Sequence, residues 1–314
     1  MKYLAKKLFT LIITLFIVSL LAFLAFQIIP GNAAVLRLGT SGTPEQVEQL
    51  KQEMGLDRPI IIQYGDWLGS FLSGDMGISY TYNMPVEDMI AEKLPSTAAL
   101  VLLGCLLMIG LSIPIGIFTA RHAGGVVDRI MTVLNQILMS IPPVFVGILF
   151  SFVFGITLRV FVPGNFVSYE ESFTQFLLFM FFPALSIALS RVAMTVKLLR
   201  ASLLDEMDKN YIRTAFSRGH SRDTALRKHA LRNSLVPVIV FMAVSAAEMV
   251  AAGIIIEQVF AIPGIGRLLI ASIGTYDFPV VQAIVLILAA WVVVVNFVAD
   301  ILSQYIDPRV RLGE

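Results

Sequence analysis

The sequence is poor in charge and in cysteine. Only 14% of its 314 residues are Asp, Glu, Lys or Arg, whereas a soluble domain usually carries about 25%. Hydrophobic residues make up 57% of the chain, and the mean hydropathy is +0.83. The deficit of charge argues against a soluble domain and indicates a membrane protein. The single cysteine, Cys105, excludes a disulfide framework within the chain.

The sequence also lacks the motifs of common catalytic and metal sites. Its three histidines, His122, His220 and His229, have no second ligand at H-x-x-x-H or H-E-x-x-H spacing. No G-x-x-x-x-G-K-[ST] segment is present, so the chain has no P-loop for ATP. These absences predict a non-catalytic chain that binds no metal or cofactor of its own.

Long apolar runs are the most prominent feature that is present. A helix needs about 20 consecutive apolar residues to cross a bilayer, and lipid offers the backbone no hydrogen-bond partner. We therefore predict an all-α polytopic membrane protein with six transmembrane helices. The six runs are Leu8–Ile29, Ser96–Ala120, Ile130–Leu158 (which contains Pro142 and Pro143), Ser172–Ser190 with a continuation past Arg191, Asn233–Ile256, and Phe278–Ala299.

The first run has the basic start of a signal peptide, with Lys2, Lys6 and Lys7 before it. Its apolar core, Leu8–Ile29, is longer than the roughly 7–15 residues of a signal peptide, and the sequence PGNAAVLRL after it is a poor cleavage site. We interpret residues 1–29 as the N-terminus and a retained first span.

Lys and Arg are distributed unevenly among the connecting segments. Pro30–Pro95 has four basic residues against nine acids, whereas Lys197–Arg232 has nine basic residues against four acids. Cytoplasmic segments carry the excess of Lys and Arg. The bias predicts cytoplasmic N and C termini, an external segment at 30–95, and a core domain at 96–314 whose loop at 197–233 is cytoplasmic.

The external segment carries signals of local structure. Thr43 and Gln46 predict a helix that begins at Pro44, and a second amphipathic helix should end near Gly74. The stretch ISYTYN favours a short extended piece, and PVEDMIAEKLP favours a helix that leads into the second span. Such a cap either covers the helix ends or docks an external partner, and the sequence leaves both interpretations open.

Two charged residues, Arg191 and Glu248, interrupt the apolar runs. A charge at the centre of a membrane helix costs about 2.5–3.5 kcal/mol on insertion scales, so it is a candidate for function. We expect Arg191 to lie near a cytoplasmic end and to reach the interface. Glu248 should lie near mid-depth, where it either lines a pathway or bonds a neighbouring helix.

The loop Tyr211–Asn233 holds six Arg or Lys, two histidines and one acid. We predict two short helices, the first capped by Asp208 and stopped by Gly219, the second capped by Ser221 and ending near Asn233. The positive charge of the loop would allow it to bind anionic lipid headgroups. An exposed apolar face, a glycine break and direct entry into a span favour a protein dock instead. That face holds Ile212, Ala215 and Phe216.

The segments RTAFSRG and HALRN resemble the cytoplasmic signature loop of bacterial ABC-importer permeases. In that family an alanine, here Ala215, stands four residues before a glycine, here Gly219, and a second patch follows, here His229–Asn233. The broader pattern ends in Leu-Pro, whereas LRN at this point is similar to the dipeptide, oligopeptide and nickel branch. Further resemblances run along the whole chain in GLDRPIIIQYGDWL, GDMGIS, LPST, IEQVFAIPGIGRLL, YDFPVVQA and YIDPRVRLG.

The resemblance implies the type I ABC-importer permease fold in the bacterial cytoplasmic (inner) membrane. It also implies a homologous second permease subunit, two cytoplasmic ATPase subunits that bind ATP and Mg²⁺, and an external solute-binding protein; no nucleic acid is involved. The residues that it assigns to ATPase coupling are Tyr211, Ile212, Ala215, Phe216, Gly219, His229, Leu231 and Asn233. Glu248 is a separate candidate for the translocation pathway.

The cargo remains open at this point, because peptide and nickel permeases of this branch share these segments. We expect di- or oligopeptides, with nickel or a metal chelate as the alternative. Two other classes predict different observations. A secondary ion-coupled transporter favours several charges at mid-depth and an internal repeat, neither of which is evident. A receptor or scaffold predicts that uptake survives deletion of the chain.

Overall fold

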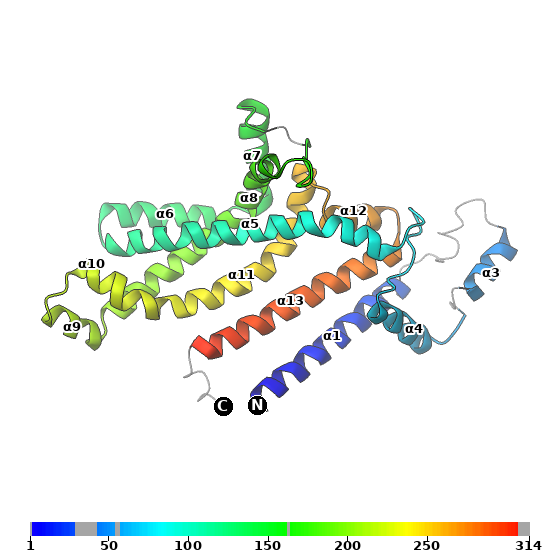
Figure 1. Cartoon of the computed structure of the whole chain (residues 1–314), viewed down its shortest axis with the longest axis horizontal. Helices are drawn as coiled ribbons and strands as arrows, with labels where there is room; N and C mark the ends of the chain where they lie inside the picture. Colours follow the sequence, from blue (N-terminus) through cyan, green and yellow to red (C-terminus); the bar gives the residue numbers. More distant parts are fainter. Residues whose placement is uncertain (1, 29–42, 54–56, 162–163, 307–314) are drawn as a thin grey trace. The chain divides into compact units, whose positions relative to one another are not determined.

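The computed structural model describes residues 2–28, 43–53, 57–161 and 164–306. In these ranges the regular structure is helical, apart from an isolated antiparallel bridge between Ile78 and Pro85. The predicted all-α polytopic fold is confirmed: within the described ranges, five helices are long and apolar enough to cross a membrane, and a bent pair gives a sixth when counted as one span. The five are α1 (Lys2–Ile28), α5 (Val86–Arg121), α8 (Phe173–Met207), α11 (Leu231–Phe260) and α13 (Phe278–Ile306) (Figure 1).

The third predicted span, Ile130–Leu158, is not one straight helix. It consists of α6 (Val126–Ser140), α7 (Pro143–Phe150) and the π-helix η2 (Ser151–Thr157), with a bend of 97° after α6. Ile141 and Pro142 break the helix, because proline lacks an N–H and disfavours helical backbone in the residue before it. Their ψ angles of 121° and 142° are extended.

The chain divides into two compact units, Met1–Ser96 with Pro263–Val294, and Thr97–Ile262 with Val295–Glu314. In the first unit, α4 (Ile60–Ser73) packs on α1 through Tyr64, whose hydroxyl lies 2.7 Å from Ser19 Oγ. The rings of Phe16 and Phe23 contact the same tyrosine edge-on. These contacts join the first span to the segment after it.

The predicted local signals of the external segment are largely confirmed. Thr43 and Gln46 form a reciprocal capping box at the start of α3 (Pro44–Glu53), with N···O distances of 3.0 and 3.3 Å. Gly74 ends α4 at φ +95°. The helix predicted from PVEDMIAEKLP runs straight into α5, so the boundary at 95/96 falls inside one helix. Residues 30–42 lie outside the described residues, as do Ile29 and the tail at 307–314.

In the stretch 78–83 only Ile78 is paired as in a strand, and the residues after it form a tight turn, so the prediction of an extended piece is wrong beyond Ile78. Asn83 has φ +52°, and its N–H donates to Ser79 O at 3.0 Å. The buried carboxylate of Asp277 holds this turn by accepting from Ser79 Oγ at 2.5 Å and from the N–H groups of Tyr80 and Thr81 at 3.0 and 3.3 Å. Asp277 lies just after α12 (Ile265–Gly274). A carboxylate 198 residues away thus sets the path of this loop.

In the second unit, α5 approaches α8 closely at two of its glycines. A Cβ built on Gly104 would lie 2.9 Å from Ile187 Cδ1, and one on Gly116 would lie 2.8 Å from Leu199 Cδ2. Membrane helices pack through such small residues. An ion pair between Asp128 and Arg200, with two contacts of 2.6 Å, joins α6 to α8 near the start of the loop described next.

The orientation of the chain gives a labelling prediction. In a Cys105→Ser background, an impermeant thiol reagent applied to intact spheroplasts should modify a cysteine at Ser73 but not one at Ser221. Both positions are exposed, so reagent access depends on the side of the membrane. Labelling of Ser221→Cys but not of Ser73→Cys would reverse the orientation.

Candidate functional site

The basic loop forms a helix–turn–helix between α8 and α11 (Figure 1). After α8 comes α9 (Asn210–Ser217), then a turn at Gly219, then α10 (Arg222–Thr224) and the π-helix η3 (Ala225–Ala230), which continues directly into α11. The second helix was predicted to end near Asn233. It runs through Leu231 and Asn233 into the fifth span, so the predicted direct entry into that span is confirmed and no loop separates the turn from it.

Two of the three predicted end signals of the loop helices are confirmed. Gly219 has φ +85° and its N–H donates to Phe216 O at 2.9 Å. Ser221 Oγ accepts from Thr224 N at 3.3 Å and caps α10. The cap predicted at Asp208 is wrong, because this residue continues the end of α8 with ψ −7°. Lys209, whose ψ of 151° is extended, stands at the start of α9 instead.

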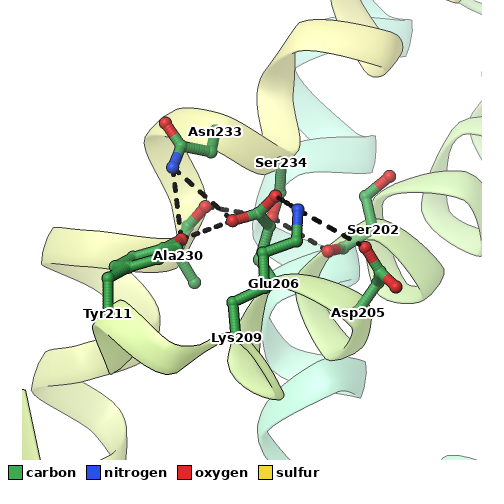
Figure 2. A network of polar contacts seen from close by, with 8 residues as sticks. All are labelled: Ser202, Asp205, Glu206, Lys209, Tyr211, Ala230, Asn233 and Ser234. Atoms are coloured by element: carbon green, nitrogen blue, oxygen red, sulfur yellow. Dashed lines mark hydrogen bonds and ion pairs between the residues drawn. The ribbon is translucent and has the colours of Figure 1, made fainter. Parts of the chain in front are cut away.

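Three helix ends meet at the carboxylate of Glu206, as Figure 2 shows. This side chain, at the end of α8, accepts from Lys209 Nζ and from Tyr211 Oη. Asn233 Nδ2, on α11, donates to Tyr211 Oη at 3.2 Å and to Glu206 Oε2 at 3.5 Å. Nearby, Ser234 Oγ donates to Ser202 O at 3.1 Å. We call Glu206, Lys209, Tyr211 and Asn233 the hinge cluster.

The hinge cluster brings together Tyr211 and Asn233, two residues for which the family resemblance implied a coupling role. Hydrogen bonding to Glu206 raises the pKa of Lys209 above its ordinary value, despite the opposing effect of burial. Burial, and then the hydrogen bond to Glu206, raises the pKa of Tyr211. Both side chains are therefore protonated donors at neutral pH, and the loop is attached to α8 and α11 by bonds to a charged acceptor.

The predicted apolar docking face of α9 is only partly exposed. Ile212 is 0% and Ala215 6% exposed, so both pack against the chain itself. Phe216 and Tyr211 are 41% and 39% exposed and remain accessible. The expectation of an exposed face containing Ile212 and Ala215 is wrong, because helical spacing identifies residues that share a face but not what covers it.

A pocket of about 280 Å³ lies between α9 and η3. The rings of His220 and His229 lie 5.2 Å apart beside it. His229 Nε2 is buried and has no hydrogen-bond partner among the described residues. Arg218 adds a positive charge. The residues that line the pocket are Tyr211, Thr214, Ala215, Arg218, His220 and His229.

Glu248 and Arg191 form an ion pair with each other across α11 and α8. The Arg191 side chain is 26% and the Glu248 side chain 50% exposed. Arg191 was expected near the cytoplasmic end of its span; it lies about 27 Å of helix from the outer end of α8, close to the roughly 30 Å of a hydrocarbon core, and α8 then continues for sixteen residues to Met207. The structure thus places Glu248 far from the loop and gives it a partner that the sequence did not indicate.

Sequence reasoning missed three acids that the structure makes prominent. Glu206 centres the hinge cluster, and its spacing of three residues from Lys209 was a usable signal. Asp277 holds the external turn. Glu257 is 0% exposed and accepts from Thr97 Oγ1 at 2.5 Å. No sequence signal indicated the partners of Asp277 or Glu257, because these lie more than 150 residues away.

Comparison with known proteins shows the family to which this chain is similar. Residues 112–312 match the family described as binding-protein-dependent transport system inner membrane component, and residues 1–101 match the N-terminal part of such membrane components. A Brucella abortus (strain 2308) protein, named as a permease protein of a peptide transport system, is 36% identical over 306 residues, or 98% of each chain.

Two further relatives are similar over nearly their whole length. The dipeptide transport system permease protein DppB of Lactococcus lactis is 33% identical over 312 residues, which cover 99% of each chain. The oligopeptide transport system permease protein AppB of Bacillus subtilis is 31% identical over 297 residues, or 94% of each chain. With its helical spans and its broken loop, the chain belongs to the binding-protein-dependent transport system inner membrane components, and it is a multi-pass bacterial inner membrane permease with the type I ABC-importer fold.

Proposed function

We propose that this chain forms half of the translocation pathway of an ATP-driven importer for di- or oligopeptides. The observation that carries the proposal is similarity along almost the entire chain to permeases named for peptide, dipeptide and oligopeptide transport. A second permease subunit would complete the pathway, and an external solute-binding protein would deliver the cargo. ATP and Mg²⁺ would bind to two cytoplasmic ATPase subunits.

The loop between α8 and α11 is the proposed contact with the ATPase. Phe216 and Tyr211 offer exposed aromatic area, and the neighbouring pocket offers Arg218 and two histidines to a partner side chain. Aromatic residues and Arg are the side chains that contribute most at protein interfaces. Movement of an ATPase subunit would pass through η3 into α11, because no flexible loop intervenes.

The hinge cluster would hold α9 rigidly against α8 and α11. Glu206 belongs to α8, whereas Asn233 belongs to α11, and both bond to Tyr211 on α9. A push on α9 would therefore act on two spans together. Tyr211 and Asn233 would then transmit the movement, and Phe216 would contact the ATPase.

Uptake by the reconstituted complex tests the proposal. Proteoliposomes that contain both permeases and the ATPase subunits should accumulate labelled trialanine when ATP and the loaded binding protein are supplied on the appropriate sides. Complexes that lack this chain should not, and a proton ionophore should leave uptake unchanged. Accumulation of nickel but not of trialanine would contradict the peptide assignment, and collapse of uptake with the ionophore would contradict the ATP-driven class.

A further inference from the structure

The ion pair Arg191–Glu248 joins α8 to α11 within the membrane-spanning part of the second unit. Glu248 precedes the outer end of α11, at Phe260, by twelve residues, or about 18 Å of helix. Arg191 follows the outer end of α8, at Phe173, by eighteen residues, or about 27 Å. The hydrocarbon core is about 30 Å thick, so Glu248 lies well inside it, whereas Arg191 lies near its cytoplasmic boundary.

Although Glu248 lies at membrane depth, its own chain does not cover the pair. Half of the Glu248 side chain is exposed even with the ion pair formed. Pro237, Ala251, Ile255 and Gln258 are exposed on the same helix, and their spacing places them with Glu248 on one face of α11. A carboxylate at this depth is not stable against lipid, so protein or water must cover this face in the assembled complex.

The chemistry of the pair favours a water-lined pathway for zwitterions. A lone carboxylate would retain cations, whereas two opposite charges side by side have no net charge and retain neither sign. A free peptide carries one ammonium and one carboxylate. Each end can replace one member of the pair, and an exchange between equivalent ion pairs leaves no charge without a partner.

We propose that Arg191 and Glu248 together form a contact site for the charged ends of peptide cargo within the pathway. Glu248 accepts hydrogen bonds from the ammonium group, and Arg191 donates to the carboxylate, in turn as the peptide passes. Between passages the two side chains bond to each other. The inference rests on the proposed peptide function and specifies which chemical groups of the cargo this chain selects.

Peptides with one blocked end test the site. Trialanine, N-acetyl-trialanine and trialanine amide would each be supplied on the binding protein at saturating concentration, so that initial uptake reports passage rather than capture. Wild-type complex should carry trialanine about tenfold faster than either blocked form, since each block removes one charge-assisted bond. Glu248→Gln should carry trialanine and N-acetyl-trialanine at similar rates while still carrying the amide more slowly. Arg191→Gln should carry trialanine and trialanine amide at similar rates while still carrying the acetylated form more slowly.

Each single variant leaves one charge without its partner, and the double variant Arg191→Gln/Glu248→Gln controls for the effect of that unpaired charge. It should assemble with the other subunits and carry all three peptides at similar rates. If the single variants change all three rates by one common factor, or if the double variant fails to assemble, the pair is a structural or subunit contact and the inference is wrong. A wild-type complex that carries none of the three peptides would instead refute the proposed peptide function.

Discussion

Replacing Gly219 by proline should reduce peptide uptake at least about tenfold while the chain still inserts and pairs with its partner permease. Gly219 has φ +85°, whereas proline is held near −65°. Its N–H also donates to Phe216 O at 2.9 Å, and proline has no N–H. The turn between α9 and α10 must then take another path, which moves Phe216 and the pocket away from the ATPase.

Two further variants separate the loss of this turn from general damage. Gly219→Asn should keep most of the uptake, because asparagine tolerates a positive φ and a Cβ here meets no atom of the described structure within 4 Å. Gly74→Pro makes the same change at a glycine with φ +95° and the same type of N–H bond, but on the external side of the membrane, away from the ATPase. ATPase subunits should co-purify with Gly74→Pro and not with Gly219→Pro; equal co-purification would contradict the role of the loop.

Neutralising the hinge cluster should uncouple ATP hydrolysis from uptake. In Glu206→Gln, the amide oxygen can still accept from Tyr211, but the ion pair with Lys209 is lost. The loss is about 1.5 kcal/mol, the low end for a bond to a charged group, because Lys209 is half exposed. We expect uptake per ATP hydrolysed to fall about tenfold, as measured by paired uptake and phosphate-release assays.

The neighbouring residue provides a matched control for the hinge cluster. Asp205 lies 3.6 Å from the same Lys209 Nζ, but its side chain is 78% exposed. Exposed ion pairs contribute little, so Asp205→Asn should leave coupling near the wild-type value. Equal uncoupling in Asp205→Asn and Glu206→Gln would mean that net charge, rather than the bonds of the buried carboxylate, sets the effect.

Signals that act over a few residues were read correctly from the sequence. The capping box at Thr43, the stops at Gly74 and Gly219, and the cap at Ser221 each depend on the backbone within one helical turn. The apolar runs were equally reliable, because bilayer thickness sets their length.

Features that depend on distant parts of the chain were not read correctly. The Pro142–Pro143 pair was visible, but whether it bends a helix or divides it depends on the packing of α7 against α8 and α11. Ile212 and Ala215 share a face with Phe216, yet only the fold reveals that they are buried. Arg191 and Glu248 are 57 residues apart, so their pairing follows from the contact of α8 with α11 and not from spacing.

The contact of Phe216 with the ATPase is the most direct test of the coupling account. A photo-reactive phenylalanine analogue at Phe216, which is 41% exposed, should form adducts with an ATPase subunit in the assembled complex. The same analogue at Phe145 on α7, which is 65% exposed, should form none with that subunit. Adducts from Phe216 that contain only lipid, in a complex shown to hold its ATPase subunits, would contradict the account.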